Sequence, residues 1–150
     1  FISAGGPHRL VWVKRPFEPR CIMNSHADLF DAVQMYFDGL FYCDKEKLDA
    51  VFHPAASLFD AEKGAIFAEP VASFNEDVGG NAANSPHALG QKMDSEILMV
   101  DHMSPVSALV KIRFRARRNV YQDHLSMLKG ENGWQIVAKV WCLEKVVDQI

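Results

Sequence analysis

Apolar residues recur every three or four positions from Leu29 to Phe41, which is the spacing of one face of an α-helix. Asn24 or Ser25 stands just before this stretch, and the side chain of either can cap the first turn. A second, shorter helix is predicted over residues 45–52, where apolar residues again fall on one side. A His-Pro pair follows, and the residue before a proline disfavours helical backbone, so this helix ends there.

A turn centred on Gly64 separates two short apolar runs, at residues 56–60 and 65–68. Glycine adopts the backbone of a tight turn without steric cost, so the two runs are predicted to form a β-hairpin. Pro70 can then open a third, short helix. Residues 81–94 are rich in small and polar residues, which predicts a long loop of the kind that often covers a binding site.

Four strands are predicted in the C-terminal third, at residues 96–102, 106–115, 120–128 and 134–143. The second shows the clearest pattern, because every other residue from Val106 to Phe114 is apolar and mostly polar residues stand between them. Such alternation is typical of an antiparallel strand with one face in the core and one in water. Helices first and strands last predict an α+β domain, and a chain of 150 residues fits one domain.

Composition and charge exclude several classes of function. Hydrophobic residues make up 49% of the chain and its net charge is −3, which favours a globular protein and gives no basic surface for nucleic acid or an anionic membrane. No apolar run is long enough to span a membrane. The odd number of cysteines and the absence of a CxxC pair suggest reduced thiols, so we expect a cytoplasmic protein. The histidines show no metal-binding spacing and no glycine-rich phosphate loop is present, so neither a metal nor a cofactor is expected.

The first part of the chain differs from the rest. Residues 1–22 show no clear period and carry four Lys/Arg residues against one glutamate. We expect this segment to be a leader or a flexible arm in front of a domain over residues 23–150. An arm that binds a partner through Trp12 and Phe17 is the alternative.

Two segments carry a resemblance to a known family. Tyr36-Phe37-Asp38-Gly39-Leu40, followed by Phe52-His53-Pro54, resembles the opening of the lumazine-binding, SnoaL-like branch of the nuclear transport factor 2-like superfamily, and residues 121–141 resemble its ending. The resemblance implies three N-terminal helices packed on a strongly curved, mostly antiparallel sheet in a cone shape. It also implies a pocket for a small apolar molecule and a homodimer formed through the sheet. It fixes no activity, because the superfamily hosts both enzymes and non-catalytic binders.

Residues 33–36, 56–60 and 122–125 resemble the helix and the two strands that carry the polar site residues of ketosteroid isomerase. This resemblance implies that Tyr36 and Asp123 donate hydrogen bonds to an enolate oxygen and that Asp60 is the general base. Asp123 could donate only when protonated, which requires an apolar site that raises its pKa. The chain departs from the isomerase just after Asp60, where Ala61 follows. Each residue also has a structural alternative: a tyrosine packed with its hydroxyl at the surface, a structural hydrogen bond from Asp123, and a solvated hairpin carboxylate.

The candidate pocket is described by a wider set of residues. If Leu125 and Met127 face the core, the period of two places Tyr121 and Asp123 on the same inner face. The residues expected to line the pocket are Phe37, Phe41, His53, Phe59, Phe67, Phe114, Tyr121 and Trp141. Asp101 and His102, near a strand end, are reserve acid or base candidates.

Two functions remain open from the sequence. One is a protein that binds a small, mostly apolar molecule, with possible isomerase or dehydratase chemistry on a carbonyl compound. The other is a non-catalytic module that pairs with a second copy through the outer face of the sheet. His124, which alternates with Asp123 and should point outward, would lie on that face with Trp141. A basic stripe is expected there as well, formed by Lys111, Arg113, Arg115, Arg117 and Arg118.

Overall fold

The structure is a computed structural model that describes residues 22–149, so the predictions for the leader segment lie outside the described residues. The elements in chain order are α1 (Ile22–Tyr42), α2 (Lys45–Val51), β1 (Phe52–Glu62), β2 (Ala65–Pro70), α3 (Val71–Gly79), the short 3-10 helix η2 (Ala82–Asn84), β3 (Ser95–Ser104), β4 (Ser107–Ala116), β5 (Asn119–Gly130) and β6 (Gly133–Val146). The predicted α+β order of elements is confirmed. No helix in this part of the chain is long and apolar enough to cross a lipid bilayer.

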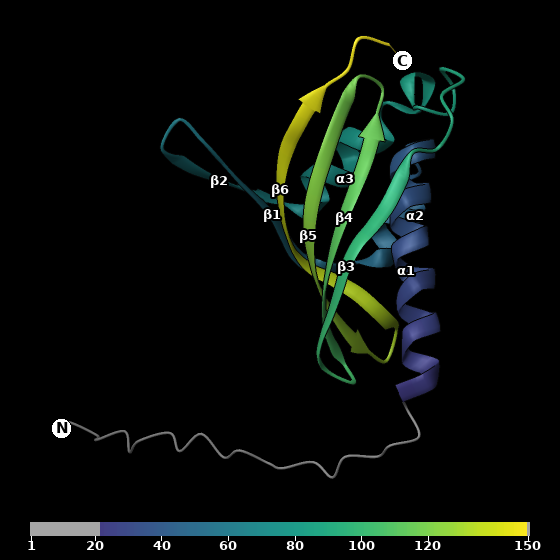
Figure 1. The fold of residues 1–150 in the computed structure, drawn as a ribbon, viewed down its shortest axis with the longest axis vertical. Helices are drawn as coiled ribbons and strands as arrows, with labels where there is room; N and C mark the ends of the chain where they lie inside the picture. Colours follow the sequence, from purple (N-terminus) through teal and green to yellow (C-terminus); the bar gives the residue numbers. More distant parts are fainter. Residues whose placement is uncertain (1–21, 150) are drawn as a thin grey trace, which may run out of the picture.

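The six strands form one sheet in the order β2-β1-β6-β5-β4-β3. Every neighbouring pair is antiparallel except β1 and β6, which run parallel. Figure 1 shows that the sheet is strongly curved and that α1 runs along its concave side. Apolar side chains from the sheet and the helices form the core between these two layers.

Helix α1 supplies the main apolar layer over the sheet. Leu29, Val33, Tyr36, Phe37 and Phe41 are all buried, as the three-four spacing predicts. The helix begins at Ile22, so the prediction that Asn24 or Ser25 caps it is wrong.

The shorter helices frame the same core. Helix α2 is capped by Asp44, whose carboxylate accepts a hydrogen bond from the backbone N–H of Lys47. It ends at Val51, and Phe52 begins β1 rather than closing the helix. Helix α3 follows Pro70 directly, as predicted.

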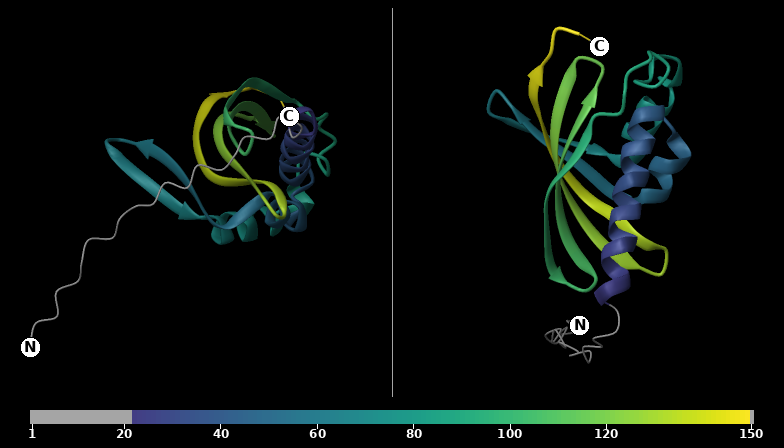
Figure 2. Two further views of the ribbon diagram at one scale, coloured as in Figure 1. Left: turned by 90° about the horizontal axis from the view of Figure 1, so that it is seen from below. Right: turned by 45° about the vertical axis from the view of Figure 1, so that its right-hand side comes forward.

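The hairpin of β1 and β2 leaves the body of the molecule. Figure 2 shows it projecting beyond the curved sheet, and every residue of β2 except Glu69 is exposed. Ile66 and Phe67 are among the exposed apolar side chains. The outer part of the hairpin contacts little of the core, whereas Ala56 and Leu58 at the base of β1 are buried.

Strand β6 contains a β-bulge that changes which side chains face inward. Ile136 is opposite Met127 and Ala138 is opposite Ser126, so Val137 has no opposite residue on β5. One extra residue in a strand exchanges the two faces beyond it. Trp134 and Ile136 face the core before the bulge, and Lys139 is buried on the inner face after it.

The second predicted strand behaves as its pattern requires. Ala108, Val110, Ile112 and Phe114 are buried and alternate with more exposed residues. Val106 differs from the predicted pattern. It lies in the turn before β4 and is exposed, because the strand begins one residue later.

Candidate functional site

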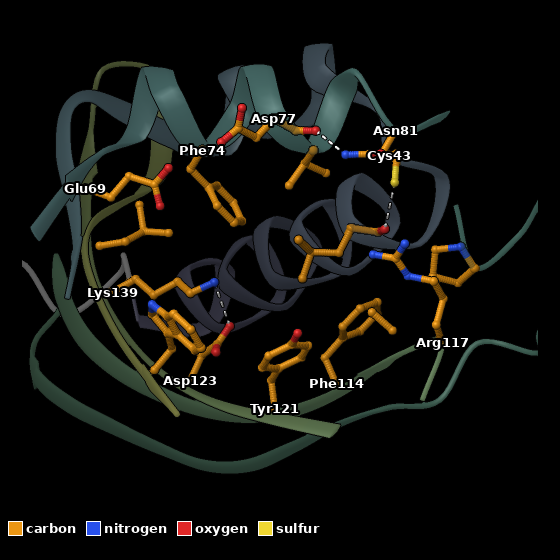
Figure 3. Close-up of a pocket in the computed structure, with 16 residues that line it drawn as sticks. Cys43, Glu69, Phe74, Asp77, Asn81, Phe114, Arg117, Tyr121, Asp123 and Lys139 are labelled. Atoms are coloured by element: carbon orange, nitrogen blue, oxygen red, sulfur yellow. Dashed lines mark hydrogen bonds and ion pairs between the residues drawn. The ribbon is translucent and has the colours of Figure 1, made fainter. Parts of the chain in front are cut away.

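A cavity of about 310 Å³ lies between the concave face of the sheet and helices α1 and α3 (Figure 3). Its lining residues come from both layers and from the loops at the rim: Leu40, Cys43, Leu58, Glu69, Phe74, Asp77, Val78, Asn81, Pro86, Phe114, Ala116, Arg117, Tyr121, Asp123, Lys139 and Trp141.

Aromatic rings form opposite walls of this cavity. Tyr121 and Trp141 stand edge to face on the sheet, with ring centroids 5.8 Å apart and an interplanar angle of 70°. Phe114 lies beside them and is supported from behind by Phe37, with centroids 6.2 Å apart in a stacked arrangement. Phe74 of α3 faces these rings from the other wall (Figure 3). Rings on two walls favour a flat, mostly apolar ligand between them.

One end of the cavity holds three polar side chains in mutual contact. The Tyr36 hydroxyl donates a hydrogen bond to Oδ2 of Asp123 over 2.6 Å and accepts one from Nζ of Lys139 over 2.8 Å. Nζ of Lys139 also lies 3.3 Å from the same carboxylate oxygen. The side chains of Lys139 and Asp123 are only 7% and 3% exposed, so this ion pair is shielded from solvent. We call Tyr36, Asp123 and Lys139 the buried triad.

Burial favours the protonated form of Tyr36. It raises the pKa of Tyr36 well above the usual 10.0, and the neighbouring Asp123 carboxylate raises it further. Tyr36 is therefore a neutral hydrogen-bond donor at neutral pH. The Lys139 ammonium gains a cation–π contact, since Nζ lies 4.6 Å from the centre of the Phe74 ring.

The triad leaves one acceptor unused. Oδ1 of Asp123 is buried and has no hydrogen-bond partner among the described residues. An unsatisfied buried acceptor costs about 1–3 kcal/mol, so a group that donates to it would be bound with that gain.

Tyr36 and Asp123 were both predicted as site residues, and the structure brings them together. Tyr36 is fully buried and lies behind the cavity wall, where its hydroxyl orients the carboxylate rather than reaching the cavity. Asp123 is on the inner face of β5 with Tyr121, as the period of two predicts. The expected role of Asp123 as a hydrogen-bond donor required an apolar site. Instead, Lys139 forms an ion pair with Asp123. A carboxylate in an ion pair accepts hydrogen bonds and does not donate them.

Asp60 lies apart from Tyr36 and Asp123. It lies on the projecting part of β1, opposite Phe67 of β2, and does not line the cavity. Phe67 lies outside the cavity for the same reason, whereas Phe59 is paired with β6 and faces away from the cavity because the preceding residue, Leu58, lines it. His53 is exposed, and its Nδ1 accepts a hydrogen bond from the backbone N–H of Ala55, so it also lies outside the cavity.

The remaining predicted residues divide into two groups. Phe114, Tyr121 and Trp141 line the cavity, whereas Phe37 and Phe41 are buried in the core behind it.

The reserve pair lies far from the cavity. Asp101 is exposed, and His102 packs against Trp134, with ring centroids 6.0 Å apart. His102 is opposite Ala108 of β4, whereas the cavity is lined by Phe114 and Ala116 at the other end of that strand.

Lys139 and Arg117 are cavity residues that sequence reasoning missed. Strict alternation from Trp134 places Lys139 on the outer face, and the bulge at Val137 reverses this. One signal was available: Trp134 and Trp141 are an odd number of positions apart, so both can face inward only if the strand contains a bulge. Arg117 lies in a turn, where alternation gives no information. Among residues 22–149, no group of His, Cys, Asp and Glu gathers in a way that could hold a metal ion.

Comparison with solved structures agrees with this architecture. A nuclear transport factor 2-like protein of unknown function from Silicibacter pomeroyi is 20% identical and superposes with a TM-score of 0.70, covering 81% of this chain and 98% of its own. A similar protein from Shewanella baltica is 15% identical with a TM-score of 0.70, covering 82% and 96%. A ketosteroid isomerase-like protein from Erwinia carotovora atroseptica is 13% identical with a TM-score of 0.53, covering 85% and 99%. At these identities the likeness concerns the fold alone.

No curated protein matches the chain. A family match, in contrast, covers residues 24–142, which include α2, α3, strands β1 to β5, most of β6, the buried triad and the whole cavity. The fold is that of nuclear transport factor 2-like proteins, and the chain belongs to the family described as "Putative lumazine-binding".

Proposed function

We propose that the chain binds a small, flat ring compound in this cavity and holds one polar edge of it at Asp123. The observation that carries the proposal is the unpartnered Oδ1 of that buried carboxylate. Oδ1 is shielded from water, but the terminal torsion of a carboxylate is soft. A small rotation therefore brings an oxygen of Asp123 to a ligand N–H or O–H group.

The size and walls of the cavity support a ligand of this kind. A volume of about 310 Å³ falls at the lower end of the range of small-molecule sites, roughly 300–1,000 Å³. The rings of Phe74, Phe114, Tyr121 and Trp141 offer flat apolar contacts. A bicyclic ring fits this volume and these walls better than a flexible chain, whose ordering would cost more conformational entropy.

The charged groups support a ligand that has a donor and an acceptor side by side. Lys139 has three N–H groups: one donates to the Tyr36 hydroxyl, and the ammonium also forms an ion pair with Asp123. A remaining N–H and the free acceptor of Asp123 can pair with a carbonyl and a neighbouring N–H of one ring. The family description names lumazine, a bicyclic ring with this arrangement of groups.

Proton transfer on a carbonyl ligand is the second candidate. It is favoured by the direct contact between a carboxylate base and an ammonium group at the cavity. Asp123 would remove a proton from the carbon beside a carbonyl, the electron pair would move to the oxygen, and Lys139 would stabilise the enolate. Deuterium exchange at that carbon, followed by NMR on a cyclic ketone, is expected with wild type and absent with Asp123→Asn. Equal exchange in both proteins would contradict this role.

Pairing of two copies through the outer face of the sheet remains a prediction. His124, Leu128 and Val140 are exposed on β5 and β6, which leaves apolar surface available on that side. Binding in the cavity and pairing through the sheet can coexist, since they use opposite faces.

A pair of matched probes tests the binding proposal. Naphthol and methoxynaphthalene share the same bicyclic ring, but only naphthol can donate a hydrogen bond. We expect wild type to bind naphthol about tenfold more tightly, because one hydrogen bond to a charged acceptor gives at least that ratio. Fluorescence titration measures both affinities, and lumazine can be added as a third probe. Absence of binding by all three compounds would contradict the proposal.

A further inference from the structure

Arg117 is a cation at the cavity that no described residue neutralises. It lies in the turn between β4 and β5 and lines the cavity. Figure 3 shows its guanidinium turned into the cavity, at the end away from Lys139 and Asp123. No carboxylate of residues 22–149 forms an ion pair with it.

The neighbouring arginines are used differently. Arg113 pairs with Glu144 and Glu96 on the outer face of the sheet. Arg118 donates to the backbone carbonyl of Val147, and Arg115 donates to that of Arg117. Arg117 was expected on the outer face with these arginines, but it differs from them in both direction and partners.

The backbone of this turn makes the choice of arginine notable. Arg117 has a φ of 58°, in the left-handed region that favours glycine and asparagine. Its backbone N–H donates to Oε1 of Gln91 over 2.8 Å, which holds the turn in place. Any residue with a Cβ is disfavoured for folding at such a position, so the turn itself gives no reason for an arginine.

The charges around the rim are separated. Burial raises the pKa of the Cys43 thiol and the charge of Arg117 acts in the opposite direction, so the guanidinium lies near Cys43. Glu69 and Asp77 line the cavity from β2 and α3, on the wall opposite the turn (Figure 3). An anionic group would therefore be attracted to the Arg117 end and repelled from the opposite wall.

We infer that the ligand carries a carboxylate at the end of its ring away from Asp123, and that Arg117 binds this group. The inference rests on the proposed function of the cavity. An arginine fork matches a carboxylate with two parallel hydrogen bonds, which fixes both position and direction. The ligand class is thus a flat ring acid, with an N–H or O–H edge at the buried triad and a carboxylate at the rim.

The test compares a hydroxynaphthoic acid, whose hydroxyl and carboxylate lie on opposite rings, with its methyl ester. Wild type is expected to bind the acid on the order of tenfold more tightly than the ester at low ionic strength. Added salt should reduce this ratio, because the contact lies at the rim. In Arg117→Gln the acid and the ester are expected to bind equally, whereas the control Arg118→Gln should keep the wild-type ratio.

A second variant separates binding from folding. Arg117→Gly suits the positive φ, so its melting temperature should be no lower than that of wild type while the preference for the acid is lost. Equal binding of acid and ester by wild type, or a preference that survives in Arg117→Gln, would overturn the inference. If naphthol and the ester bind but the acid has no advantage, only the carboxylate assignment fails. If none of the three compounds binds, the proposed function fails with it.

Discussion

Replacement of Lys139 by methionine is expected to lower the free energy of unfolding by about 3–5 kcal/mol, the usual cost of removing one partner of a buried ion pair. Methionine keeps the length of the side chain, but the carboxylate of Asp123 would remain buried with Tyr36 as its hydrogen-bond donor. Urea unfolding measures the loss. Lys129→Met is the matched control: Lys129 pairs with Asp28 over 3.0 Å at the surface, where such a pair contributes about 0–1 kcal/mol.

The double variant Lys139→Met with Asp123→Asn completes this test. This variant removes both charges. Its loss of unfolding free energy should therefore be clearly smaller than the sum of the losses in Lys139→Met and Asp123→Asn. Additive losses would mean that the two side chains do not interact in the folded protein.

Tyr36→Phe is expected to flatten the alkaline dependence of stability. Burial, with Asp123 adding to it, raises the pKa of Tyr36 above 10.0, so the folded state holds the phenol proton more tightly than the unfolded chain. The resulting stability is fully present below pH 10 and falls as the pH rises beyond it, by about 1.4 kcal/mol per pH unit. The variant lacks this proton, and it should also be less stable at neutral pH by about 1–2 kcal/mol because a buried hydrogen bond is lost.

Urea unfolding at a series of pH values, from neutral to above 10.0, makes this comparison. Tyr42→Phe serves as the control because Tyr42 is 42% exposed and should leave the alkaline decline unchanged. If Tyr36→Phe declined as steeply as wild type, the phenol of Tyr36 would not be held in its neutral form by burial.

Periodicity was enough to predict most of the fold. The three-four spacing of α1 and the alternation of β4 locate their buried faces, because both elements have one face in water. The same rule places Tyr121 and Asp123 on one inner face. Periodicity does not predict the placement of β1 and β2, because nothing in their local pattern indicates that the hairpin leaves the body of the protein.

The candidate site was predicted in part for a related reason. Tyr36 and Asp123 were identified from resemblance, and their contact joins residues far apart in the chain. Lys139 was not identified, because a single unpaired residue, Val137, exchanges the inner and outer faces of β6. That one bulge changes the chemistry of the site: it places an ammonium beside Asp123 and makes the carboxylate an acceptor. Asp60 was misplaced because resemblance gave its strand but not the direction of the hairpin.

The most direct test of the cavity as a binding site is calorimetric titration of naphthol and methoxynaphthalene into wild type and Asp123→Asn. In the variant, the amide oxygen would take the hydrogen bonds from Tyr36 and Lys139, which leaves an N–H donor where Oδ1 stood. The account predicts that wild type prefers naphthol and that the variant, checked for folding beforehand, prefers methoxynaphthalene. Asp101→Asn, which changes an exposed carboxylate away from the cavity, should behave as wild type. An unchanged preference for naphthol in Asp123→Asn would contradict the assignment of Asp123 as the acceptor that holds the ligand.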